Sequence, residues 1–157
     1  MKRAIIYYSL TDNTKTAAEK LSEKLDADIY RIELEKPLPS SKAKQMFEGG
    51  RQAVFELCPA ITGVSERFRD YDEIILGMPV WAGKPASPIN TLLTDKALAE
   101  KVTAVFTFSG GGDNGGCIKV LRKKLDNLKY DIALADRNSK FAGENDKKLD
   151  EFVQRLG

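Results

Sequence analysis

The chain has no histidine and only two cysteines, Cys58 and Cys117, among its 157 residues. The lack of histidine excludes a Cys/His zinc site and histidine acid–base catalysis. The two cysteines lie far apart and form no CxxC motif, so we expect two free thiols in a reducing cytosol.

The sequence also lacks an excess of one charge and any long apolar run. With 25 basic and 23 acidic side chains its net charge is +2, which favours neither nucleic acid nor an acidic membrane as a partner. No segment has the apolar length of a transmembrane helix, and residues 1–6 lead straight into a strand without a signal-like stretch. We therefore expect one cytoplasmic globular domain over residues 1–157 that binds no membrane and no nucleic acid.

Common phosphate-binding motifs are missing as well. There is no GxxxxGK[ST] loop and no GxGxxG fingerprint, which argues against a P-loop nucleotidase and a dinucleotide Rossmann site. A phosphate-accepting response regulator needs aspartates clustered at strand ends. Here the first predicted strand ends at Tyr8-Ser9 and the third at Gly77-Met78, so that class is excluded too.

Segments with the pattern of a strand alternate with segments of helical spacing five times along the chain. Strands are predicted at residues 4–8, 28–34, 71–77, 102–108 and 130–135. Helices are predicted after each of them, from residue 11 to 25 and over 42–55, 87–93, 118–125 and 149–156. Within 42–55, Gly49-Gly50 indicates a break or a close backbone contact. This alternation predicts an α/β fold, with a parallel sheet covered by helices on both faces.

Three loops follow predicted strands and would meet at one edge of such a sheet. The first loop, residues 9–14, carries short polar side chains where a strand passes into a helix, which suits a phosphate monoester. The alternative is that Thr11, Asp12 and Asn13 only cap the helix and turn the chain. The candidate ligand-binding residues of this loop are Ser9, Leu10, Thr11, Asp12, Asn13 and Thr14.

The other two loops suit a flat ligand. The second, residues 79–83, holds the only tryptophan in a predicted rigid turn, where its ring would either stack on a planar ligand or pack against neighbouring elements. The third, residues 109–116, contains five glycines, which would let the backbone approach a ring. Their candidate residues are Pro79, Val80, Trp81, Ala82, Gly83, Ser109, Gly110, Gly111, Gly112, Asn114 and Gly115.

At these loops the sequence resembles the flavodoxin family, and the resemblance covers nearly the whole chain. Residues 9–14 are similar to the family's [ST]-x-T-G-N-T phosphate loop, and residues 79–83 to the P-[IV]-W-x-G loop of its short members. The resemblance implies a doubly wound five-stranded parallel sheet of order 2-1-3-4-5 that binds FMN. Ser9, Thr11, Asn13 and Thr14 would then hold the phosphate, and Trp81 would lie beside the isoalloxazine ring.

The sequence departs from the family pattern at three points. Asp12 stands where the family usually has glycine, and its carboxylate would repel a phosphate dianion, with Lys15 as a partial offset. Ala82 replaces a second aromatic residue. The net charge of +2 differs from the strongly acidic character of electron-carrier flavodoxins.

Three functions are compatible with these features. The first is an FMN-binding electron-transfer protein, monomeric or weakly dimeric, that serves a redox partner protein or a small-molecule acceptor. The second is an FMN-dependent NAD(P)H:quinone-type reductase, and the third is a flavodoxin-fold binding module that has lost FMN. A basic stretch is expected to be a solvated helix face, with docking of an acidic partner as the alternative; it comprises Lys119, Arg122, Lys123, Lys124 and Lys129.

Overall fold

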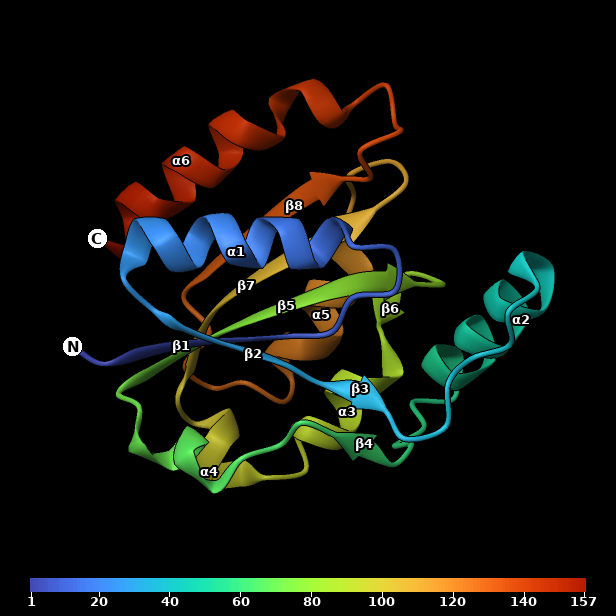
Figure 1. The fold of residues 1–157 in the computed structure, drawn as a ribbon, viewed down its shortest axis with the longest axis horizontal. Coiled ribbons are helices and arrows are strands. Elements are labelled where there is room, and N and C mark those ends of the chain that lie inside the picture. Colours follow the sequence, from blue (N-terminus) through green and yellow to red (C-terminus); the bar gives the residue numbers. More distant parts are fainter.

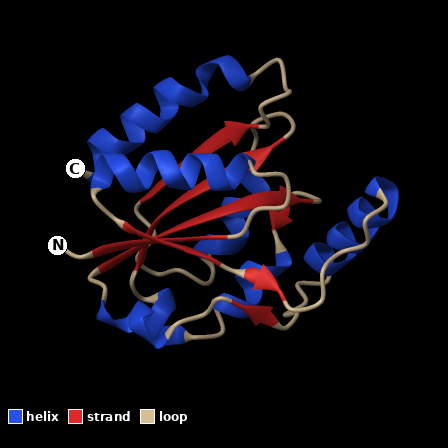
Figure 2. Ribbon diagram, viewed as in Figure 1, coloured by secondary structure: helices blue, strands red, loops and turns tan.

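A parallel sheet forms the centre of the computed structural model, which describes residues 1–157 (Figures 1 and 2). Its strands lie in the order β2-β1-β5-β7-β8, and each neighbouring pair is parallel. Counted along the chain as the five parallel strands, this order is the predicted 2-1-3-4-5. The strands are β1 (Arg3–Tyr7), β2 (Asp28–Arg31), β5 (Glu73–Trp81), β7 (Val102–Ser109) and β8 (Tyr130–Ala135).

Helices cover both faces of this sheet, as predicted. On one face α1 (Asn13–Leu25) and α6 (Asn145–Leu156) bury Leu21 and Phe152 in a core of 14 residues. On the other, α3 (Ser87–Leu92), α4 (Lys96–Ala99) and α5 (Gly115–Arg122) pack into a core of 23 residues. The remaining long helix, α2 (Lys42–Val54), stands beside the end of the sheet (Figure 1). None of the helices has the length and apolar character needed to cross a bilayer.

Two predicted strands have different bounds in the structure. The expected strand at 28–34 is divided at Ile32: β2 pairs with β1, while β3 (Glu33–Leu34) forms an antiparallel ribbon with β4 (Ile61–Thr62). The expected strand at 71–77 begins two residues later and continues to Trp81, because its end pairs antiparallel with β6 (Lys84–Pro85). The short helices η1 (Glu66–Asp70), α4 and η2 (Ala142–Glu144) were not predicted.

The strand register brings the predicted loops to the same edge of the sheet. Tyr7 of β1 lies opposite Gly77 of β5, and Gly77 lies opposite Phe106 of β7. A Cβ on Gly77 would lie 2.1 Å from Phe106 Cζ, so glycine is required beneath that ring. The three candidate loops start at residues 9, 79 and 109, at most three residues after these aligned positions. The loops therefore lie at the same edge of the sheet.

Candidate functional site

The first loop, residues 9–14, ends in an open helix N-terminus. Asp12 is the N-cap residue, with φ 63° and ψ 0° in the left-handed region, yet its side chain makes no capping hydrogen bond. Its carbonyl oxygen accepts from the Thr16 amide at 3.0 Å and from Thr16 Oγ1 at 2.9 Å. The amides of Asn13 and Thr14 donate to no protein acceptor. The alternative prediction that the Asp12 side chain caps the helix is therefore wrong. Two backbone N–H groups remain free to bind an anion at the positive end of the helix dipole.

Side-chain contacts within the same loop fix its shape. Ser9 and Thr14 are buried, whereas Thr11 and Asp12 are exposed. Ser9 Oγ accepts from the Lys15 amide at 3.2 Å, which satisfies one more N–H of the first helical turn. Ser9 and Thr14 thus fix the loop to the core, while Thr11 and Asp12 face solvent.

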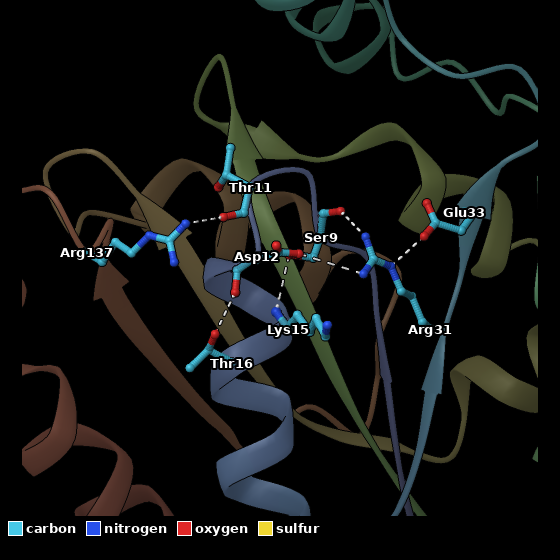
Figure 3. A network of polar contacts seen from close by, with 8 residues as sticks. All are labelled: Ser9, Thr11, Asp12, Lys15, Thr16, Arg31, Glu33 and Arg137. Atoms are coloured by element: carbon cyan, nitrogen blue, oxygen red, sulfur yellow. Dashed lines mark hydrogen bonds and ion pairs between the residues drawn. The ribbon is translucent and has the colours of Figure 1, made fainter. Parts of the chain in front are cut away.

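Arg31, at the carboxyl end of β2, lies against this loop because β2 is the neighbour of β1 (Figure 3). Its Nη2 donates to the Ser9 carbonyl oxygen at 3.0 Å, and its Nη1 lies 3.8 Å from Asp12 Oδ1. Its Nε is 2.5 Å from Glu33 Oε1, but the N–H is not aligned as a hydrogen bond and is shielded from solvent. One cation thus lies between two carboxylates at the rim of the loop.

A second arginine approaches from the opposite side of the loop, just after β8 (Figure 3). Arg137 Nη2 donates to the Thr11 carbonyl oxygen at 3.1 Å, and its backbone N–H donates to Asn13 Oδ1 at 3.3 Å. The Asn13 side chain in turn donates from Nδ2 to Asp136 Oδ1 at 3.4 Å. Burial raises the pKa of Asp136 above its ordinary value. The segment after β8, the last strand, therefore helps to hold a loop that lies more than a hundred residues earlier in the sequence.

The second loop, residues 79–83, is the tip of a β-hairpin with a tight two-residue turn. Val80 pairs with Pro85 and Trp81 with Lys84, which leaves Ala82 and Gly83 as the turn. Both turn residues have positive φ, 50° and 76°, as a two-residue type I′ connection requires. The hairpin projects Trp81 beyond the last residues of the neighbouring strands.

Trp81 both packs against the protein and lines a cavity. Its ring meets Tyr8 edge to face, with centroids 5.5 Å apart, and a Cβ on Gly49 of α2 would lie 3.4 Å from its Cδ2 and Cε3 atoms. Burial raises the pKa of Tyr8 to about 12. The cavity of about 290 Å³ beside the indole is lined by Leu10, Gln45, Met46, Gly49, Gly50, Val80, Trp81 and Ala82. The two interpretations of the tryptophan are thus compatible.

The third loop is shorter than predicted, because Gly115 and Gly116 belong to α5. Helix formation there is favoured by the Asp113 side chain, whose Oδ1 accepts from the Gly115 amide at 3.0 Å. A Cβ on Gly116 would lie 2.7 Å from the Gly83 carbonyl oxygen, so glycine allows α5 to approach the hairpin. At Gly110 and Gly111 a Cβ would meet nothing within 4 Å, which leaves that part of the backbone open to a ligand.

Comparison with known proteins identifies the family of this fold. The flavodoxin family profile matches residues 2–153. The chain belongs to the flavodoxin family. No curated protein sequence matches it significantly.

Solved structures of flavoproteins resemble this flavodoxin-family chain over most of its length. A flavoprotein from Lactobacillus acidophilus NCFM, solved in complex with FMN, is 29% identical with a TM-score of 0.69, over 94% of this chain and 97% of that one. A putative flavoprotein from Bacteroides eggerthii is 25% identical with a TM-score of 0.74, over 99% and 97%. Oxidised flavodoxin 2 from Bacillus cereus, 17% identical with a TM-score of 0.55 over 98% and 96%, shares the fold.

The site of this flavodoxin-family protein includes elements that the sequence analysis missed. Of the predicted residues, Leu10, Val80, Trp81 and Ala82 line one cavity. The Asn114 side chain instead donates to Asp131 Oδ2 at 3.3 Å, and so is engaged within the protein. The missed elements are α2, Arg31 and Arg137. Arg31 could have been found from the strand order, since the end of the second strand must lie beside the first loop.

The predicted basic stretch is partly neutralised within the protein. Lys124 lies 3.3 Å from Glu56 Oε1, and Arg122 lies 3.3 Å from Asp131 Oδ1. Two of its five cations therefore have acidic partners in the fold, which weakens the case for a docking surface there.

Proposed function

We propose that this protein binds FMN at the carboxyl edge of its sheet and acts as an electron-transfer flavoprotein. The observation that carries the proposal is the position of a tryptophan-lined cavity beside a polar loop with unpaired amides. When bound, FMN supplies one- and two-electron redox chemistry. The acidophilus relative, solved with FMN, supports the cofactor assignment.

The residues of the site fit such a ligand by their chemistry. The amides of Asn13 and Thr14 would hold the phosphate at the N-terminus of α1. Trp81 would cover a ring face, since α2 and Tyr8 hold its indole in place. The open backbone at Gly110 and Gly111 would face the polar edge of the ring and limit its contact with water.

The test uses Trp81 as an internal reporter, because it is the only tryptophan. Titrating the flavin-free protein with FMN should quench Trp81 emission and flavin emission together and saturate at one flavin per chain. Non-specific quenching is controlled by repeating the flavin measurement with the unfolded chain. An FMN titration that leaves both emissions and the flavin spectrum unchanged would refute the proposal and support the module that has lost FMN.

The alternative redox function is an FMN-dependent reductase of the NAD(P)H:quinone type. It is favoured by the net charge of +2, which differs from the acidic surface used by carriers to dock on basic partners. Rapid oxidation of NADH or NADPH by the FMN-loaded protein, with turnover on addition of a quinone, would support the reductase. No oxidation, together with reduction by a partner reductase, would support the carrier.

The partner and the assembly state form part of the same proposal. We propose a monomer or weak dimer that exchanges electrons with a redox protein or a small-molecule acceptor. Sedimentation at several concentrations, with and without FMN, measures the assembly state. A stable higher oligomer would contradict it.

A further inference from the structure

The rim of the first loop holds a set of alternating charges that the sequence motif does not contain. Arg31 lies between Asp12 and Glu33, at 3.8 and 2.5 Å, on one side. Arg137 lies on the other side, donates to the Thr11 carbonyl oxygen and forms no ion pair (Figure 3). Positive charge thus reaches this loop from two strands at opposite ends of the sheet order.

The carboxylate of Asp12 makes this positive charge necessary for an anion. Asp12 is the N-cap residue beside the free amides of Asn13 and Thr14, so a phosphate bound there would be close to a like charge. Arg31 is the one cation within ion-pairing distance of Asp12. Its Nε is shielded from solvent next to Glu33, so Arg31 acts at this rim through its charge on Asp12.

Arg137 contributes in a different way. It holds the Thr11 carbonyl oxygen and, through its backbone N–H, the Asn13 side chain. Because no carboxylate pairs with it, its charge is not cancelled locally, and guanidinium groups suit phosphate oxygens. Arg137 therefore combines anchoring of the loop with a long-range attraction for an anion.

We propose that Arg31 and Arg137 determine the preference of this site for a flavin that carries a phosphate monoester over the same flavin without it. Arg31 acts by neutralising Asp12, and Arg137 acts as the uncompensated cation. The inference rests on the proposed function, because it concerns the phosphate end of the FMN site.

The experiment compares FMN and riboflavin binding in the wild type, Arg31→Gln and Arg137→Gln. Arg69→Gln is the matched control, since Arg69 is an exposed arginine in η1 that pairs with Asp95 at 3.6 Å and precedes β5. Each test variant should weaken FMN binding by about five- to tenfold and riboflavin binding by less than about twofold. The loss should shrink between about 0.01 M and 0.15 M ionic strength. Thermal melting of each flavin-free variant verifies that it is folded.

A double variant separates charge neutralisation from simple structural support. If Arg31 acts by neutralising Asp12, Asp12→Asn should strengthen FMN binding by a larger factor in Arg31→Gln than in the wild type. If Arg31 only supports the loop through the Ser9 carbonyl, Asp12→Asn should strengthen FMN binding by the same factor in the wild type and in Arg31→Gln. That result, or equal FMN affinity in the wild type and both single variants, overturns the proposal.

Inorganic phosphate distinguishes failure of this inference from failure of the proposed function. In the flavin-free wild type, phosphate should raise the melting temperature more than chloride at equal ionic strength, and less so in Arg31→Gln and Arg137→Gln. A wild type that binds no flavin but shows this arginine-dependent phosphate effect refutes the FMN function and retains the charged subsite. FMN binding without any arginine dependence retains the function and refutes the subsite.

Discussion

Replacing Asp12 separates the charge of the phosphate loop from its backbone conformation. Asp12 has φ 63°, which asparagine and glycine also adopt readily but alanine does not. Asp12→Asn removes the charge alone, Asp12→Gly removes the charge and the Cβ, and Asp12→Ala removes the charge while retaining a Cβ. The three variants therefore give different combinations of the two effects.

The expected stability changes of the flavin-free protein follow from the exposed position of Asp12. Its pair with Arg31 spans 3.8 Å between side chains that are 60% and 33% exposed, so the pair contributes less than about 1 kcal/mol. Asp12→Asn should therefore change the free energy of unfolding by at most about 0.5 kcal/mol. Asp12→Gly relieves the left-handed strain but adds freedom to the unfolded chain by a similar amount, about 0.5–1 kcal/mol. Asp12→Ala should cost about 1 kcal/mol, or a fall in melting temperature of about 2–4 °C.

The expected affinity changes follow from charge instead. A unit charge near a phosphate at a protein surface costs about 1–2 kcal/mol once screening and the Arg31 pair are allowed for, or about 5- to 30-fold in the dissociation constant. Asp12→Asn and Asp12→Gly should strengthen FMN binding equally by that factor and leave riboflavin binding unchanged. Fluorescence titration measures both. If Asp12→Gly strengthened binding and Asp12→Asn did not, conformation rather than charge would limit the site, and the electrostatic reasoning would be refuted.

Three further predictions test the packing around the site. Gly77→Ala places a Cβ 2.1 Å from the Phe106 ring; it should destabilise the fold by about 2–3 kcal/mol in urea unfolding, and an unchanged midpoint would contradict the register described. Gly49→Ala places a Cβ at an acceptable 3.4 Å from the indole; it should stabilise the protein by up to about 1 kcal/mol, whereas Gly49→Leu should shift the tryptophan emission. Burial raises the pKa of Cys117 to about 12 while Cys58 is exposed; a thiol reagent should therefore label one cysteine in the native protein and two after unfolding, and labelling of both in the native state would contradict the burial.

The five parallel strands could be predicted because four are compact apolar runs, the second alternates apolar and polar residues, and a helical segment follows each of them. The β3–β4 ribbon could not, since each of its strands has two residues and exists only through the other. The extension of β5 was missed for a related reason. Pro79 indicates a turn by local propensity, but the antiparallel partner at Lys84–Pro85 keeps the chain extended to Trp81.

The glycines had a local interpretation that tertiary contacts overrode. Gly49 and Gly50 do not break α2, which is continuous from Lys42 to Val54, and the predicted close contact is the one with Trp81. The density of glycines in residues 109–116 predicted a loop that includes Gly116. In the structure Gly116 is the second residue of α5, and it is a glycine because a Cβ there would lie 2.7 Å from the Gly83 carbonyl oxygen.

Asp12 shows that the effect of a residue that departs from a motif depends on the residues that the fold places beside it. Read alone, a carboxylate in a phosphate loop counts against phosphate. The fold brings Arg31 from the adjacent strand to within 3.8 Å of it, and the left-handed backbone of a glycine position is kept. The two residues then form one unit, in which the cation is needed only because the carboxylate is present. It follows that Arg31→Gln should weaken FMN binding strongly in the wild type and only slightly in the Asp12→Gly background. Equal losses in both backgrounds would mean that Arg31 affects FMN binding independently of Asp12, and the account of the two residues as one unit would be refuted.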